Sequence, residues 1–171
     1  MESKKELAKR KHPRIGNFDY SSVGSYFITI CTQNRRCVLS RIVGRGLAPA
    51  ETTDIEYTRF GKIAKENLLS LEKRYPHLSV EQYVIMPNHI HAIFVLSDAT
   101  AGASPRPTIM DIVCAYKSLT AIECKRNGFK DKLFQNSFYE HIIKNCEDYD
   151  QISKYIYYNP LRWQDDELYT E

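Results

Sequence analysis

The stretch that most constrains the fold is YVIMPNHIHAIFVL, residues 83–96, in which two apolar runs flank Pro87 and Asn88. Aliphatic and β-branched runs of this length predict strands. A Pro-Asn dipeptide favours a tight turn, because Pro pre-sets the first corner and Asn tolerates the second. We therefore predict an antiparallel hairpin with His89 and His91 on its outgoing strand. Successive side chains of a strand point to opposite faces, so the two imidazoles share one face.

The remaining hydrophobic patterns are strand-like in some segments and helix-like in others. Period-2 or β-branched runs predict further strands at residues 25–32, 37–43 and 133–145, and QNRR is expected to join the first two as a hairpin. Apolar residues at helical spacing predict helices over residues 54–76, 108–128 and 146–160. This order does not alternate as parallel β-α-β units do. We therefore expect an α+β fold, an antiparallel sheet with helices packed on it.

Length and composition fit one domain that is not exported. The chain has 171 residues, of which 43% are hydrophobic, and no apolar run long enough to cross a membrane. Its five cysteines are odd in number and scattered, which indicates reduced thiols and a cytoplasmic location. We expect a basic, partly disordered segment over residues 1–20, a single domain over 21–163 and an acidic tail over 164–171.

Positive charge is concentrated near the N-terminus, although the net charge is only +3. Residues 1–14 carry six basic side chains against two acidic ones, and residues 32–46 add four arginines with no acidic residue. Such a distribution suits a polyanionic partner. A solvated tail and a soluble hairpin explain the same charges, so charge alone leaves both interpretations open.

Two imidazoles on one strand face can converge on a divalent metal ion. Ordinary polar residues on a solvated strand face are the alternative, and two ligands alone do not complete a site. The last predicted helix offers further candidates, because Tyr155 and Asn159 are four residues apart and share one face, which Gln151 extends. An amide oxygen from Asn159 is a hard ligand that suits Mg²⁺ or Mn²⁺.

A tyrosine beside a divalent ion is an arrangement for nucleophilic attack on a phosphodiester. Tyr155 is the candidate, because Tyr157 and Tyr158 point away from the face of Asn159. We expect those two rings to pack on the sheet, as aromatic helix ends commonly do. Packing on the sheet would also explain Tyr155, so this pattern does not decide between a catalytic and a structural role for that residue.

Three motifs, MPNHIHAI, FYEHIIKN and YIYYNPLRW, occur in this order and resemble those of the REP-associated tyrosine transposases. These proteins are relatives of the single-tyrosine HUH transposases of small insertion sequences. The resemblance covers about residues 12 to 163 and departs from the family pattern at Ala92 and Phe134, where many relatives carry Gly and Trp. It implies an RRM-like or ferredoxin-like antiparallel sheet, with helices packed on one face and a C-terminal catalytic helix.

The resemblance also implies roles for individual residues. His89 and His91 match the metal-binding pair of the family, Tyr155 matches the nucleophile, and Asn159 matches the polar ligand one helical turn later. The implied activity is that of a metal-dependent endonuclease and strand transferase that cleaves single-stranded, hairpin-forming DNA through a 5′-phosphotyrosine. Contacts with the DNA backbone are expected from the basic side chains of Lys9, Arg10, Lys11, Arg35 and Arg36.

A binding module without catalysis is the alternative function. An RRM-like domain can recognise hairpin DNA or RNA with aromatic and histidine side chains that stack on bases. The joint presence of Tyr155, His89, His91 and Asn159 favours the enzyme. Insertion-sequence relatives form dimers that can share active sites, so the resemblance leaves open whether the chain acts as a monomer or a homodimer.

Overall fold

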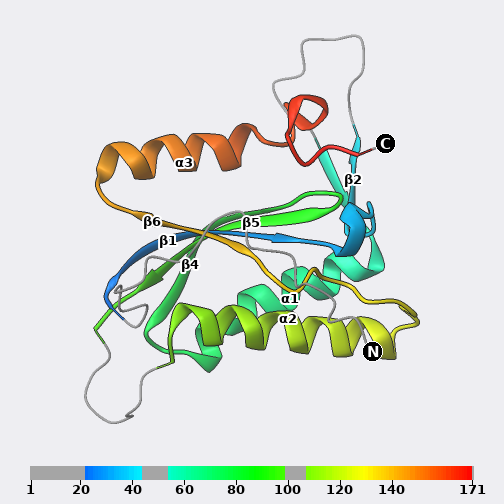
Figure 1. Ribbon diagram of the computed structural model, residues 1–171, viewed down its shortest axis with the longest axis horizontal. Helices are drawn as coiled ribbons and strands as arrows, with labels where there is room; N and C mark the ends of the chain where they lie inside the picture. The colour runs from blue at the N-terminus through cyan, green and yellow to red at the C-terminus, as the bar shows by residue number, and fades with distance from the viewer. Residues whose placement is uncertain (1–21, 44–53, 99–106, 171) are drawn as a thin grey trace, which may run out of the picture.

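A computed structural model describes residues 22–43, 54–98 and 107–170, and its centre is a four-stranded antiparallel sheet (Figure 1). The strand order is β4-β5-β1-β6. The strands span Gly24–Cys31 (β1), Leu78–Ile85 (β4), His89–Leu96 (β5) and Tyr139–Ile143 (β6). This confirms the predicted α+β class. The basic segment 1–20, with Lys9, Arg10 and Lys11, lies outside the described residues.

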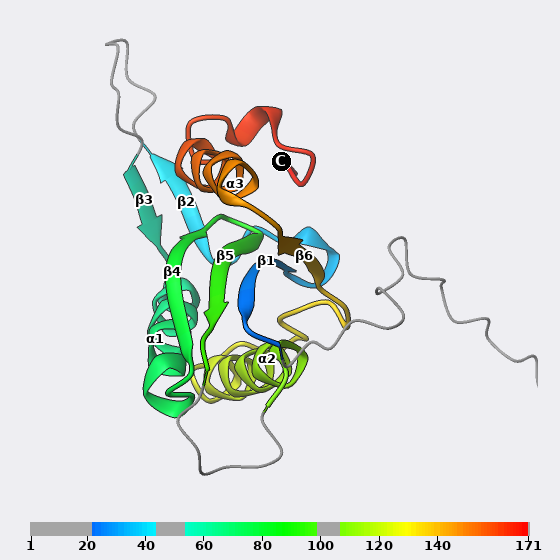
Figure 2. The ribbon, with the colours of Figure 1, turned by 90° about the vertical axis from the view of Figure 1, so that its left-hand side faces the viewer.

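Helices cover both faces of the sheet, as Figures 1 and 2 show. α1 (Arg59–Arg74) and α2 (Ile109–Arg126) lie on one face, and α3 (Cys146–Tyr158) lies on the other. Each helix begins where a side chain caps its free backbone N–H groups. The caps are Thr58, Thr108 and Asn145. Within the described ranges, no helix combines the length and the apolar character needed to cross a membrane.

The register of β1 against β5 divides their side chains between the two faces. Ile30 pairs with Ile90 and belongs to the hydrophobic core beneath α1 and α2. Thr29 pairs with His91 one position away, so both point to the opposite face, where α3 lies. The alternation that the sequence predicted for residues 83–96 therefore places both histidines beneath α3.

The hairpin of β4 and β5 is confirmed, with its tight turn at Pro87 and Asn88. The backbone N–H of Met86 donates to the carbonyl of His89 at 2.9 Å and closes the turn. Asn88 is completely buried, because the turn lies beneath the C-terminal residues of the chain. The first histidine is thus held directly beside a fixed turn.

The predicted hairpin between residues 25–32 and 37–43 is wrong. QNRR forms a short 3-10 turn in which Asn34 and Arg35 take positive φ values of 57° and 52°, and this turn directs the chain away from the main sheet. β2 (Ser40–Val43) instead pairs with β3 (Asp54–Tyr57) in a separate two-stranded sheet. Residues 54–57, which we predicted as the start of a helix, are therefore a strand. Their alternation of exposed and half-buried side chains is the period-2 signal that the helical pattern after Thr58 obscured.

Candidate functional site

The histidine pair lies at the start of β5, in the layer between the sheet and α3. His89 is 0% exposed and His91 is 2% exposed, with ring centroids 4.4 Å apart. The ring of Phe27, from β1, stacks on His91 at 5.2 Å. The alternative of two polar residues on a solvated strand face is therefore wrong, because α3 and the residues after it cover this face.

Asn88 fixes the orientation of the His89 ring. Its side-chain oxygen lies 2.8 Å from Nδ1 of His89, and its Nδ2 donates to the Leu168 carbonyl at 2.7 Å and to the Thr170 hydroxyl at 3.1 Å. Because those contacts require the amide nitrogen, the amide oxygen must face His89. Nδ1 of His89 is then the protonated nitrogen, and Nε2 keeps its lone pair.

His91 is held by one hydrogen bond from each side. Its Nδ1 lies 2.8 Å from the Thr29 hydroxyl, and its Nε2 lies 3.2 Å from the Tyr155 hydroxyl. Burial lowers the pKa of His89 to about 4, although Asp166 acts in the opposite direction. Burial and the adjacent His89 likewise hold the pKa of His91 well below its usual range. Both rings are neutral near pH 7, which is the state in which imidazole binds a metal.

The structure brings Tyr155 and Asn159 of the C-terminal helix to the histidine pair. The Tyr155 hydroxyl touches His91 and lies 3.4 Å from Oδ2 of Asp166. Asn159 is 3% exposed and keeps helical φ and ψ values of −56° and −42°, although it precedes Pro160. Residues separated by one helical turn therefore reach the same side of α3, as their spacing predicted.

Asp166 is the residue that the sequence analysis missed. One ligand atom from each of His89, His91 and Asp166 lies within 4.8 Å of the other two, so the group is compact enough to hold a metal ion. Asp166 belongs to a stretch that we interpreted as an acidic tail. The chain reverses after α3, and Trp163 packs beside His89 at 5.8 Å and against Tyr169 at 5.1 Å. The lone tryptophan is the signal that this segment is anchored.

Two buried polar atoms at this cluster test whether a metal ion fits. Nε2 of His89 and Oδ1 of Asn159 have no hydrogen-bond partner among the described residues. Buried polar atoms are rarely left unpaired, and a missing ion is one of the few ordinary explanations. Nδ2 of Asn159 donates to Asp166 at 2.6 Å, which turns its oxygen away from that carboxylate. Two imidazole nitrogens with amide and carboxylate oxygens form a donor set that suits Mn²⁺ or Mg²⁺.

The three tyrosines of YIYYNP differ in their surroundings. Burial, followed by the charge of Asp166, raises the pKa of Tyr155 above its usual value, so its phenol is protonated in this state. Tyr157 is 65% exposed and Tyr158 is 44% exposed. The prediction that these two rings pack on the sheet is wrong. The reason is that α3 meets the sheet through the opposite side of the helix, where Ile152 and Ile156 lie.

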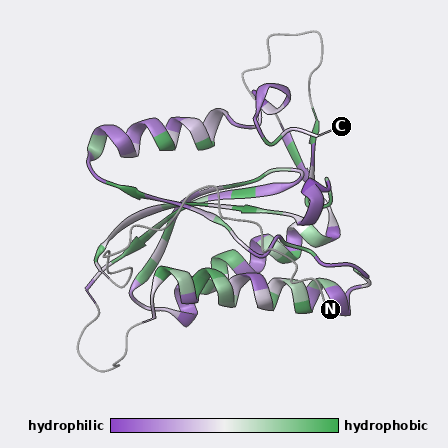
Figure 3. Cartoon of the chain, viewed as in Figure 1, coloured by the Kyte–Doolittle hydropathy of each residue, from purple (hydrophilic) through white to green (hydrophobic). Residues whose placement is uncertain are grey.

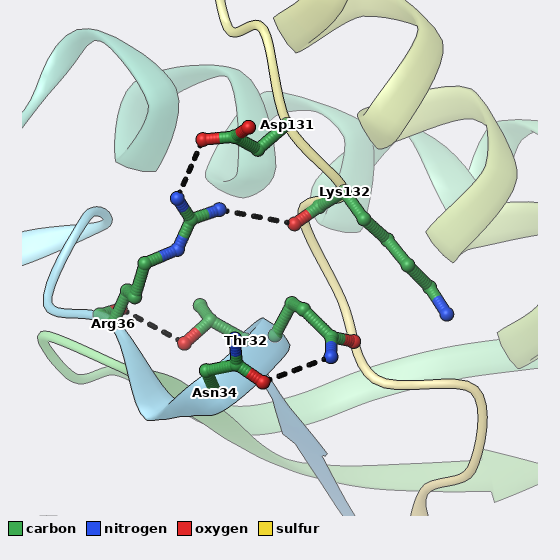
Figure 4. A network of polar contacts seen from close by, with 6 residues as sticks. Thr32, Asn34, Arg36, Asp131 and Lys132 are labelled. Carbon is green, nitrogen blue, oxygen red and sulfur yellow. Dashed lines mark hydrogen bonds and ion pairs between the residues drawn. The ribbon is translucent and has the colours of Figure 1, made fainter.

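The two described residues of the predicted DNA-binding set already have partners within the chain. The Arg36 guanidinium bonds the Asp131 carboxylate at 2.6 Å and the Lys132 carbonyl at 3.2 Å, as Figure 4 shows. Arg35 donates to the Glu167 carbonyl at 3.1 Å. Both side chains connect loops that are distant in the sequence, and their contact with DNA stays a prediction.

Fold and site together define an antiparallel α+β domain in which a buried histidine pair faces a tyrosine from a separate helix. The chain is 26% identical over 143 residues to the REP-associated tyrosine transposase of Escherichia coli (strain K12). The matched region covers 84% of this chain and 70% of that protein. It is 28% identical over 177 residues to an uncharacterized protein of Haemophilus influenzae. This match covers 95% of this chain and 94% of that protein. No protein-family model matches the chain.

The fold is also similar to that of a solved structure. That protein is a REP-associated tyrosine transposase bound to a REP hairpin, with a TM-score of 0.58, 20% sequence identity, and coverage of 91% of this chain and 74% of that chain. The resemblance to REP-associated tyrosine transposases that the motifs indicated is confirmed by these comparisons. Similarity to a transposase implies a DNA-processing enzyme.

Proposed function

We propose that this protein is a metal-dependent endonuclease and strand transferase that cleaves single-stranded, hairpin-forming DNA through a covalent 5′-phosphotyrosine at Tyr155. The observation that supports this most directly is the 3.2 Å contact between the Tyr155 hydroxyl and Nε2 of His91, at the edge of the compact His89, His91 and Asp166 cluster. A structural neighbour bound to a REP hairpin supports the choice of a hairpin substrate.

The proposed ion, Mn²⁺ or Mg²⁺, would be held by His89, His91, Asp166 and Asn159. When bound, it would supply Lewis-acid polarisation of a phosphodiester oxygen. The chain supplies the rest of the site. Asn88 keeps Nε2 of His89 unprotonated, and the burial of both rings excludes water from the ligand atoms. The donors are therefore positioned before substrate arrives, which lowers the cost of reorganisation.

Cleavage would exchange one phosphate ester for another. The Tyr155 oxygen forms a bond to phosphorus while the bond from phosphorus to the 3′ oxygen of the preceding nucleotide breaks. The phenol proton passes to Asp166, whose Oδ2 is 3.4 Å away, and the 3′ oxygen takes a proton from water. The new ester keeps the energy of the broken one, so a 3′ hydroxyl can reverse the step and rejoin a strand without ATP.

The test is a hairpin oligonucleotide with unpaired flanks, labelled at its 3′ end in one sample and at its 5′ end in another. With Mn²⁺ or Mg²⁺, only the 3′ label should remain on the denatured protein, because the 5′ fragment leaves with a free 3′ hydroxyl. Tyr155→Phe should abolish this adduct, and Tyr157→Phe, on the exposed side of the same helix, should not. Tight binding by the wild type without any adduct would instead establish the non-catalytic binding module.

The geometry also favours a site completed within one chain. Tyr155 reaches His91 of the same molecule, so the proposed cleavage needs no partner subunit. Mixing Tyr155→Phe with a His89→Ala variant should therefore yield no adduct. Adduct in the mixture would show that α3 is exchanged in a homodimer and acts in trans.

A further inference from the structure

A cavity of about 560 Å³ lies beside the proposed nucleophile. Its walls come from one side of α3 and from the turn that follows the helix. Tyr155 and Tyr158 contribute aromatic rings, and Lys154 and Arg162 contribute positive charge. Asp165 and Asp166 contribute carboxylates, and Gln151 and Asn159 complete the lining. Of these side chains, Tyr155, Asn159 and Asp166 take part in the proposed cleavage, and the others have no role in it.

We propose that this cavity binds the unpaired nucleotide next to the scissile phosphodiester, with its base against Tyr158 and the flanking backbone phosphates at Lys154 and Arg162. The inference rests on the proposed function, because Tyr155 belongs to the wall of the same cavity. The cavity is large enough for a nucleobase, because its volume lies within the range of ~300–1,000 Å³ that is typical of small-ligand sites. The hairpin stem would remain outside.

The aromatic wall suits a nucleobase. Tyr158 is 44% exposed, and among the described residues its ring neighbour is Tyr157, which meets it edge-on at 5.0 Å. An aromatic ring that is open to solvent beside the proposed nucleophile offers a face on which a base can stack. Bases stack on tyrosine faces whatever their identity, and single-strand binding proteins use this contact repeatedly.

The two cations suit the phosphates on either side of that base. Neither Lys154 nor Arg162 forms an ion pair within the described residues, in contrast to Arg36, which is bound to Asp131. Lys154, Tyr155 and Tyr158 lie on α3, Arg162 lies in the turn that follows it, and all four line the cavity. A strand in the cavity would therefore meet both cations, the nucleophile and an aromatic ring.

The two carboxylates of the lining determine where the DNA backbone can lie. Asp166 is already bonded to Asn159 and to the Leu168 backbone N–H. Asp165 has no such partner among the described side chains and would repel a phosphate, but it can accept a hydrogen bond from an amino group of a base. The charge pattern thus favours a base, rather than a phosphate, beside Asp165.

Binding without metal tests this inference separately from cleavage. Fluorescence anisotropy in EDTA compares a hairpin that carries its unpaired flank with the same hairpin trimmed to the stem. Tyr158→Ala should weaken binding of the flanked hairpin about tenfold, because it removes the ring on which the base stacks. Tyr158→Phe should retain wild-type affinity, because it keeps the ring. Tyr157→Ala, whose ring is outside the cavity, is the matched control.

Salt dependence tests the two cations. Each of Lys154→Ala and Arg162→Ala should reduce the slope of log affinity against log salt by about 0.7 for the flanked hairpin, the value for one phosphate contact with a single strand. Lys125→Ala, on α2 at the opposite face, should leave the slope unchanged. Unchanged slopes and an unchanged Tyr158→Ala affinity would overturn the inference. The inference would also be overturned if the variants lost as much affinity and slope with the trimmed hairpin, because these side chains would then contact the stem.

The two proposals fail in different ways. If the wild type forms the 3′-labelled adduct and the cavity variants bind the flank normally, the chemistry stands and the cavity assignment is wrong. If the cavity variants lose flank affinity and the wild type forms no adduct, the cavity binds single-stranded DNA in a protein that does not cleave it.

Discussion

The two faces of the four-stranded sheet are built from the same strands but have different interiors. The face beneath α1 and α2 receives side chains that are aliphatic or aromatic, and the strands contribute Ile28, Ile30, Ile90 and Phe94, each at most 1% exposed. The positions in between face α3, and there the strands contribute the polar Thr29, His89 and His91 beside apolar side chains such as Phe27 and Ile93. One face is therefore a large hydrophobic core, and the other combines a smaller hydrophobic cluster with buried polar side chains.

The helices differ less than the faces they cover. Figure 3 shows hydrophobic residues most often in α2, whereas α1 and α3 are both mixtures of hydrophilic and hydrophobic residues. Apolar contact between α3 and the sheet involves Ile152 and Ile156, and polar contacts supplement it. Gln82 of β4 donates to the Ser153 carbonyl at 3.0 Å, and Tyr155 bonds His91. The histidine cluster thus helps to hold the helix that buries it, so stability and the proposed function are coupled on this face.

The largest expected effect is on the hydrophobic face. Phe94 is completely buried beneath α1 and α2, so Phe94→Ala should lower the free energy of unfolding by about 3–5 kcal/mol, through lost burial and a cavity. Phe27→Ala, on the other face, should cost less, because that ring is 8% exposed and belongs to the smaller hydrophobic cluster, where it lies against His91 and Tyr155. Denaturant unfolding measures both values. Equal losses would show that the two faces are packed equally well.

The second effect is metal-dependent stabilisation, which we expect from the polar face only. At a free Mn²⁺ concentration of 100 Kd, binding to the folded state adds about 2.7 kcal/mol to the free energy of unfolding. A double variant, His89→Ala with His91→Ala, should lose this increment, whereas Phe94→Ala should keep it on a lower baseline. Denaturant unfolding with Mn²⁺ and with EDTA gives the difference directly. An increment that survives in the double histidine variant would place the ion elsewhere.

A third and smaller effect concerns the orientation of His89. Asn88→Ala removes the oxygen that holds Nδ1 of His89 protonated, so Mn²⁺ affinity should fall about 10- to 100-fold, as for other residues that orient a metal ligand. Titration calorimetry measures the affinity. Nitrogen-15 chemical shifts of the metal-free imidazole should report the Nδ1–H tautomer in the wild type and a mixture in the variant. Asn67→Ala, which removes an amide bonded to Glu123 between α1 and α2, is the control and should change neither.

How much of the fold could be predicted depended on how local each pattern is. The hairpin of residues 83–96 follows from adjacent residues and was correct, together with the face that its histidines share. β3 was missed because its four residues precede a strong helical pattern. The partner of β2 was missed because it depends on the turn at Asn34 and Arg35, whose positive φ values are set by packing against other parts of the chain.

The candidate site shows the same limit. Tyr155 and Asn159 could be selected together because helical spacing relates them, and the structure places both at the histidine pair. Asp166 could not be selected, because its position depends on a reversal of the chain after Pro160 and on the packing of Trp163. Acidic residues near a C-terminus are usually solvated, so composition favoured a tail. A metal ligand whose position depends only on tertiary structure leaves no local pattern in the sequence.

The smallest expected effect compares the helix caps of the two faces. Asn145 caps α3 by accepting from the Asp148 N–H at 2.9 Å, and Thr108 caps α2 in the same way through Asp111. Losing either cap costs about 1 kcal/mol. Because α3 packs on the smaller of the two hydrophobic clusters, we expect it to open locally, so Asn145→Ala should raise amide exchange in α3 about fivefold without changing α1 or α2. Thr108→Ala should instead lower the global free energy of unfolding, because α2 opens only when the shared hydrophobic core does. Equal exchange changes in both helices would mean that the polar cluster joins α3 to the rest of the fold as firmly as the hydrophobic core joins α2.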